Sequence, residues 1–101
     1  QGEIWYRKHF TPEESWKGKQ QFLHFEAIMG KSKIWVNGKL LKEHFGGFLP
    51  VIVDVTSSLK YGEDNVITVW ADNSDDPPTL PANRKMHWIL HTSEEFTGIA
   101  G

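Results

Sequence analysis

The stretch Ile34-Trp35-Val36-Asn37-Gly38-Lys39-Leu40-Leu41 decides the fold class of this chain. Apolar, β-branched and aromatic residues lie on both sides of an Asn-Gly pair. A type I′ turn needs positive φ at both central residues, and Asn and Gly tolerate this conformation best. The stretch therefore predicts an antiparallel hairpin of residues 33–36 and 39–45. Ile34 and Val36 should share one face of the hairpin, with Trp35 on the other.

Other apolar runs predict further short strands around this hairpin. Residues 20–28 alternate with period two, and we expect Leu23, Phe25 and Ala27 to face the core. The remaining expected strands are residues 4–10, 51–53, 66–72 and 86–91. Many short strands without a long amphipathic helix predict an all-β, antiparallel β-sandwich.

Turn signals separate the expected strands. Gly30-Lys31-Ser32 predicts a turn, and residues 54–59 predict a short helical turn capped by Asp, Thr or Ser. The segment from Asn73 to Pro81 is a loop rich in proline and in residues that form side-chain-to-backbone turns. Residues 92–101 show no clear element.

Length and composition limit the class of protein. A chain of 101 residues forms one domain, which we place over residues 1–101, and has no room for a separate catalytic domain. The net charge of -2 gives no reason to expect a nucleic acid or a membrane as partner. No apolar run approaches the roughly 20 residues of a membrane span. The absence of cysteine excludes disulfides and thiolate metal sites.

Aromatic residues are unusually frequent, at 13% of the chain. Five of them are tryptophans: Trp5, Trp16, Trp35, Trp70 and Trp88. For any single tryptophan, packing in the sheets is favoured over sugar stacking by roughly four to one, because large aromatic side chains are highly buried on average. The alternative role is an aromatic platform on which a sugar ring stacks.

No constellation of residues indicates catalysis, a metal or a cofactor. His87 and His91 are four residues apart, but a metal site there would need a helix and a third ligand. Glu13-Glu14 and Glu94-Glu95 are adjacent pairs, and neighbours on a strand face opposite ways, unlike a glycosidase acid and base. The run from Asp72 to Asp76 offers oxygen ligands for a cation or a sugar hydroxyl, although turn chemistry accounts for Asn73 and Ser74.

Several ordered motifs resemble one known domain family over residues 2 to 81. They are Trp5-Tyr6-Arg7-Lys8-x-Phe10, Leu23-x-Phe25-Glu26, Trp35-Val36-Asn37-Gly38-Lys39, Glu43-His44-x-Gly46-Gly47-Phe48-x-Pro50, Asp54-Val55-Thr56, Leu59-Lys60-x-Gly62-Glu63-x-Asn65 and Val69-x-Ala71-Asp72-Asn73. Together they resemble the N-terminal sugar-binding, jelly-roll (galactose-binding-like) domain of glycoside hydrolase family 2. The run Asp72-Asn73-Ser74-Asp75-Asp76-Pro77 is most similar to the β-galactosidase type.

The resemblance implies a function for the parent protein rather than for this chain alone. In that family the catalytic glutamates lie in a separate (β/α)₈ barrel further along the chain, and nothing here corresponds to it. We therefore expect a non-catalytic accessory domain that packs on the barrel of a β-galactosidase-like glycosidase, in carbohydrate metabolism. Family habit places such enzymes in the periplasm or outside the cell. The expected partners are the remainder of the glycosidase and a β-galactoside-like glycan.

The resemblance also bears on substrate contacts. Many members place an aspartate several positions before a Gly-Ile-x-Arg motif, at the rim of the active site. Gly98-Ile99-Ala100-Gly101 matches the start of that motif, but Gly101 replaces the arginine and Thr92 stands near the position of the aspartate. The candidate substrate-binding residues are Asn73, Asp75, Asp76, Thr92, Glu94 and Glu95.

The ends differ from the family pattern, which implies a sandwich that lacks a first and last strand. Open sheet edges would permit self-association, and restoring flanking residues would raise the melting temperature. Two other functions stay open. One is a free-standing carbohydrate-binding module with an exposed Trp beside Asn, Asp or Arg. The other is a ligand-free scaffold.

Overall fold

The Asn37-Gly38 pair forms the predicted two-residue turn. The φ angles are 51° at Asn37 and 82° at Gly38, both positive as a type I′ turn requires. The strands on either side pair antiparallel, with Val36 opposite Lys39. The hairpin prediction is therefore confirmed.

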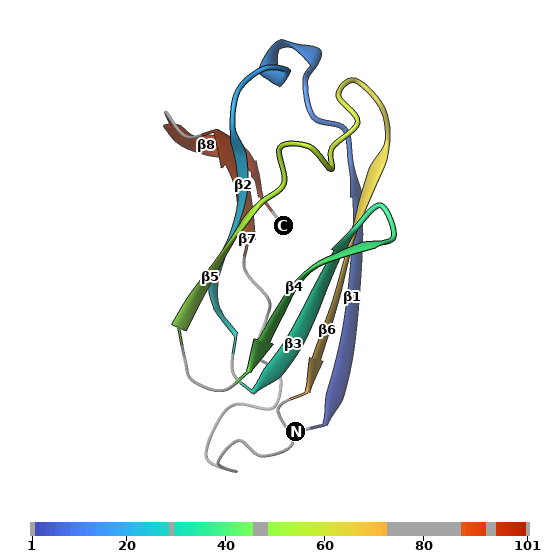
Figure 1. Ribbon diagram of the computed structural model, residues 1–101, viewed down its shortest axis with the longest axis vertical. Coiled ribbons are helices and arrows are strands. Elements are labelled where there is room, and N and C mark those ends of the chain that lie inside the picture. The colour runs from blue at the N-terminus through green and yellow to red at the C-terminus, as the bar shows by residue number, and fades with distance from the viewer. Residues whose placement is uncertain (1, 29, 46–48, 73–87, 93–94, 101) are drawn as a thin grey trace.

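The computed structural model describes residues 2–28, 30–45, 49–72, 88–92 and 95–100 (Figure 1). Its elements are β1 (Glu3–Phe10), the 3₁₀ helix η1 (Glu14–Trp16), β2 (Gln21–Ile28), β3 (Lys31–Val36), β4 (Lys39–Phe45), β5 (Leu49–Asp54), β6 (Asn65–Asp72), β7 (Trp88–Thr92) and β8 (Glu95–Ala100).

The strands form two four-stranded sheets. Sheet A has the order β1-β6-β3-β4, and sheet B has the order β5-β2-β7-β8. Every strand pair in the described residues is antiparallel. The sheets face each other as the two layers of a sandwich (Figure 1). The predicted all-β, antiparallel β-sandwich class is confirmed; the lack of a first and last strand concerns flanking sequence and stays a prediction.

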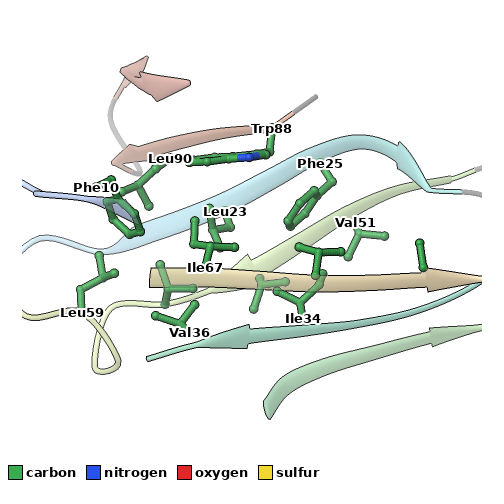
Figure 2. Packing of buried hydrophobic residues seen from close by; sticks show 14 residues of the cluster. Phe10, Leu23, Phe25, Ile34, Val36, Val51, Leu59, Ile67, Trp88 and Leu90 are labelled. Atoms are coloured by element: carbon green, nitrogen blue, oxygen red, sulfur yellow. The ribbon is translucent and has the colours of Figure 1, made fainter. Parts of the chain in front are cut away.

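The core fills the space between the sheets (Figure 2). On β2, Leu23 and Phe25 are fully buried, as their alternation predicts. Burying a side chain of this size stabilises the fold by about 1.5–3 kcal/mol. The cluster contains Phe10, Leu23, Phe25, Ile34, Val36, Val51, Val53, Val55, Leu59, Ile67, Val69, Ala71, Trp88 and Leu90.

Lys31 and Ser32 belong to β3 rather than to the predicted turn, because they pair with β4 and β6. The predicted short helical turn is confirmed in part: the Ser58 N–H donates to Val55 O at 3.0 Å and Asp54 accepts from the Thr56 N–H, but the single turn does not continue as a helix. Residues 95–100, where no element is predicted, form β8 because β7 supplies a partner strand.

Candidate functional site

The two predicted loops leave the sandwich from strand ends that lie far apart. Asp72 ends β6 opposite Glu3, at the end of the molecule where the N-terminus lies (Figure 1). Thr92 ends β7 opposite Gln21, at the other end (Figure 1). The described strands therefore do not bring the starts of the two loops together. Four of the candidate residues lie outside the described residues: Asn73, Asp75, Asp76 and Glu94.

Thr92 and Glu95 are the two candidates within the described residues, and they are paired across β7 and β8. Thr92 is only 2% exposed. Its carbonyl oxygen lies 2.8 Å from Nδ1 of His91. The side chain of Thr92 is thus part of the packed interior at this end of sheet B, whereas its backbone belongs to the β7–β8 ladder.

A hydrogen-bonded cluster fixes the backbone beside Thr92. The backbone N–H of Gln21 donates to Thr56 Oγ1 at 2.9 Å, and the side-chain Nε2 of Gln21 donates to the carbonyls of Trp16 and Lys19 at 3.2 and 3.3 Å. The backbone N–H of Val55 donates to the Gln21 carbonyl at 2.9 Å. These contacts tie the start of β2 to the turn that follows β5.

Two groups in this cluster have shifted acidity. The pKa of Asp54 is lowered, chiefly because the Thr56 hydroxyl donates to its carboxylate at 2.6 Å and the Thr56 backbone N–H donates at 3.0 Å. The pKa of Tyr61 is raised, first by burial and then by the negative charge of Asp54. Both shifts have structural causes, because Asp54 closes a side-chain turn and the Tyr61 hydroxyl donates to the Thr56 carbonyl at 3.0 Å.

Metal binding finds no support among the described residues, which contain no group of three His, Cys, Asp or Glu side chains able to hold an ion. Whether His87 and His91 share a metal, which the sequence does not favour, is not tested, since His87 lies outside the described residues. Within the described part of the chain, no helix has the length and apolar character to span a membrane.

The outer face of sheet A carries three tryptophans, which we call the tryptophan face: Trp5, Trp35 and Trp70. Trp5 is 63% exposed, and its ring stacks on that of Trp35 with centroids 5.7 Å apart and planes 21° apart. Trp70 lies directly opposite Trp5 on β6. Its indole Nε1 donates to Glu3 at 2.6 Å, and Lys33 Nζ lies 5.7 Å from the centre of its ring.

The sequence contains the signal for this face. Trp35 and Trp70 alternate along β3 and β6 with buried apolar residues, which places both side chains on the outer face. By contrast, Trp88 is 4% exposed and donates from Nε1 to the Tyr6 hydroxyl at 2.9 Å. Packing therefore explains Trp88 but does not explain Trp5. Sequence alternation gives the side of a sheet, but not whether anything covers it.

Comparison with known proteins gives one family. The family profile for glycosyl hydrolases family 2, sugar binding domain, matches residues 1–89. A β-galactosidase of Thermoanaerobacter pseudethanolicus is 38% identical over 85% of this chain, which corresponds to 12% of that enzyme. A β-glucuronidase of Formosa agariphila is 40% identical over 71% of this chain and 7% of the enzyme.

Solved structures agree with this result. The β-glucuronidase of Ruminococcus gnavus in complex with D-glucaro 1,5-lactone superposes with a TM-score of 0.67 at 33% identity, over 71% of this chain and 12% of that one. The Lactobacillus rhamnosus β-glucuronidase has the same TM-score at 40% identity and the same coverage. The chain thus spans only a small part of the relatives that it matches.

Proposed function

Because this chain belongs to the sugar-binding domain family of family 2 glycosyl hydrolases, we propose that it serves as the accessory domain of a longer glycosidase. The observation that carries the proposal is the coverage: a match over 85% of this chain spans 12% of a β-galactosidase. We place residues 1–101 in one domain of that protein, whose remainder would supply the catalytic groups.

A β-galactoside is the proposed substrate class of the parent enzyme. It is supported by the β-galactosidase match over 87 residues and by the run that follows Ala71. A β-glucuronide is the alternative, supported by the matches to β-glucuronidases. Assaying the parent protein with 4-nitrophenyl β-galactoside and β-glucuronide separates the two. If the parent protein hydrolyses neither glycoside, the glycosidase assignment is overturned.

Loop residues of this domain are the proposed points of contact with that substrate. We propose Asn73, Asp75, Asp76, Glu94 and Glu95 for direct contact, because carboxylates accept hydrogen bonds from sugar hydroxyls and the Asn amide both accepts and donates them. Thr92 is the weakest member of the candidate set, because its side chain is buried. Alanine variants of Asp75 and Asp76 in the parent protein should raise KM for the glycoside. Unchanged kinetics in both variants would remove these two residues from the site.

An independent carbohydrate-binding role is the second candidate function. It is favoured by the exposure of Trp5, which has Arg7 two residues further along on the same face of β1. An exposed indole beside an arginine is the combination expected of a sugar-binding module. Titration of the 101-residue chain with glycans, followed by tryptophan fluorescence, tests this role without the parent enzyme.

A further inference from the structure

The exposure of the tryptophan face needs an explanation. Removing a large side chain of this kind from water is worth roughly 1.5–3 kcal/mol, yet Trp5 is 63% exposed. Contiguous exposed apolar surface commonly marks a binding site. Trp70 is already engaged by Glu3 and Lys33, so the available surface is the stacked pair of Trp5 and Trp35.

Two cations flank this pair in a fixed pattern. Trp5 and Arg7 point outward from β1, and Lys33 and Trp35 point outward from β3, with β6 between them. Trp5 and Lys33 lie level with Trp70, whereas Arg7 and Trp35 lie level with Thr68. The two indoles therefore occupy one diagonal of a four-residue array, and the two cations occupy the other.

Among the described residues, no acid forms an ion pair with these cations. Within the described part of the chain, the ion pair found joins His9 to Asp64 and involves neither Arg7 nor Lys33. Glu3 accepts the hydrogen bond of Trp70, and Glu43 lies opposite Lys33 on the edge strand β4. The centre of the tryptophan face thus combines apolar ring surface with positive charge, which is complementary to a ligand that has an apolar side and a carboxylate.

Among ligand classes, this chemistry favours an acidic sugar. One side of a pyranose ring presents C–H groups that stack on an indole, and a uronic acid adds a carboxylate that Arg and Lys bind. A protein partner fits less well, because Lys33, Glu3 and Glu43 lie on this face and lysine and glutamate are depleted at protein interfaces. A nucleic acid also fits less well, because a polyanionic backbone is bound through many phosphate contacts, whereas this array offers two cations.

We propose that the tryptophan face binds a glycan that contains uronic acid, with a pyranose ring on Trp5 and Trp35 and a carboxylate bound by Arg7 or Lys33 beside the indole pair. The inference rests on the sugar-binding role proposed above but not on the glycosidase activity of the parent protein. The face is built from strands rather than from the candidate loops. It is therefore a second sugar-contact surface, distinct from the loop residues.

The experiment is a fluorescence titration of the 101-residue chain with a hyaluronan hexasaccharide, which alternates glucuronate with N-acetylglucosamine. The same hexasaccharide with its carboxylates reduced to alcohols is the matched neutral ligand. We expect saturable binding of the acidic form at or below about 1 mM, and binding of the neutral form that is at least about fivefold weaker. Raising NaCl from about 0.05 to about 0.5 M should weaken only the acidic ligand, since salt screens exposed charges.

Variants assign the binding to the face. Trp5→Ala should weaken binding of both ligands at least about tenfold, whereas Arg7→Gln and Lys33→Gln should remove the preference for the acidic form. Phe45→Ala is the matched control, because Phe45 is 65% exposed on β4 and lies away from the Trp5–Trp35 pair. This variant should bind both ligands like the parent chain. Circular dichroism of each variant establishes that it is folded.

Several outcomes would overturn the proposal. The first is that neither hexasaccharide changes the fluorescence at about 10 mM. The second is that the acidic and the neutral hexasaccharide bind with equal affinity. The third is that the Trp5→Ala variant is folded and still binds the acidic hexasaccharide as the parent chain does. Dimerisation of the chain that Trp5→Ala abolishes, without a sugar response, would assign the face to a protein contact instead. Tighter binding of oligothymidylate than of the acidic hexasaccharide would assign it to nucleic acid. None of these results depends on the activity of the parent enzyme.

Discussion

Asn37 donates a hydrogen bond from Nδ2 to Oδ1 of Asn65, which lies 2.8 Å away and 28 residues further along the chain. Asn65 is 1% exposed, and its side chain also accepts from the Lys60 N–H and donates to the carbonyls of Lys60 and Glu63. Asn37 Oδ1 in turn accepts from the backbone N–H of Val66 at 3.0 Å. Two asparagines thus join the β3–β4 turn to the loop before β6.

Replacing Asn65 with Ala should therefore be severely destabilising. The change leaves the Lys60 N–H and the carbonyls of Lys60 and Glu63 without this partner, whereas Asn37 Nδ2 keeps its hydrogen bond to the Ser58 carbonyl. Each buried group left unpaired costs about 1–3 kcal/mol, so we expect a loss of at least about 3 kcal/mol in the free energy of unfolding. Urea denaturation measures it.

A double-mutant cycle isolates the contact between the two asparagines. Asn37→Gly removes the side chain while keeping a residue that tolerates positive φ. The coupling energy between Asn37→Gly and Asn65→Ala should be about 0.5–3 kcal/mol. Additive effects of the two changes would mean that the side chains act independently.

Gly62 should tolerate alanine less well than Gly38 does. Both have positive φ, 76° and 82°, so both substitutions carry the backbone cost of about 1–2 kcal/mol. A Cβ at Gly62 would also lie 2.6 Å from Cγ of Glu14, whereas nothing lies within 4 Å of a Cβ at Gly38. We expect Gly62→Ala to lower the midpoint of urea denaturation further.

The double variant Glu14→Ala with Gly62→Ala tests whether the contact with Glu14 causes the extra loss of stability in Gly62→Ala. Truncating Glu14 removes the clashing Cγ and should bring the cost of Gly62→Ala down to that of Gly38→Ala. Glu14 is exposed, so its single substitution should change stability by no more than about 0.5 kcal/mol. A double variant as unstable as Gly62→Ala alone would show that backbone conformation accounts for the whole effect.

The hairpin and the core face of β2 were predictable because each depends on local chemistry. Asn37-Gly38 needs only its own φ angles, and period-two alternation assigns the buried face of β2 without knowledge of its partners. The turn after Asp54 was only half predictable. Its capping carboxylate was foreseen, but a side-chain turn and a helix N-terminus use the same residue types.

Features that depend on distant pairing were not predictable. Residues 95–100 contain Gly98 and Thr97 and form β8 because β7 lies beside them. The position of β6 between β1 and β3 is likewise a non-local property, and it places Trp5 near Trp35. The candidate site was not predictable for the same reason, because its geometry depends on which distant strands pair. Sequence order gave no indication that Asp72 and Thr92 end strands at opposite ends of the sandwich.

Asp54 should make the stability of the domain depend on pH in the acid range. Its folded pKa is lowered below the ordinary value of 3.8 by the two hydrogen bonds from Thr56. A lowered pKa contributes stability that is present above the unfolded pKa and is lost as the pH falls through the folded pKa. Asp54→Asn cannot titrate, so the stability advantage of the parent chain over this variant should shrink between about pH 6 and about pH 2.

Urea denaturation at each pH measures this advantage. Thr56→Ser is the matched control, because serine keeps the hydroxyl that donates to Asp54 and should keep the pH dependence. An advantage over Asp54→Asn that is constant across the range would exclude this carboxylate as the titrating group.

Ser32 is the position where removing a polar group should not destabilise the fold. The residue is 1% exposed, and its Oγ has no hydrogen-bond partner within the described part of the chain. A buried hydroxyl without a partner costs about 1–3 kcal/mol, which offsets the packing that its atom contributes. We therefore expect Ser32→Ala to leave the free energy of unfolding unchanged or to raise it by up to about 1 kcal/mol.

The control for Ser32→Ala is Ser57→Ala at an exposed position, which should change stability by less than about 0.5 kcal/mol. His44 lies opposite Ser32 across β3 and β4, and its Nε2 is also buried without a partner in the described residues. One buried water would satisfy both groups, because such waters bind polar atoms that lack protein partners. A loss of more than about 1 kcal/mol in Ser32→Ala would contradict the prediction and indicate that a bound water joins Ser32 to His44 in solution.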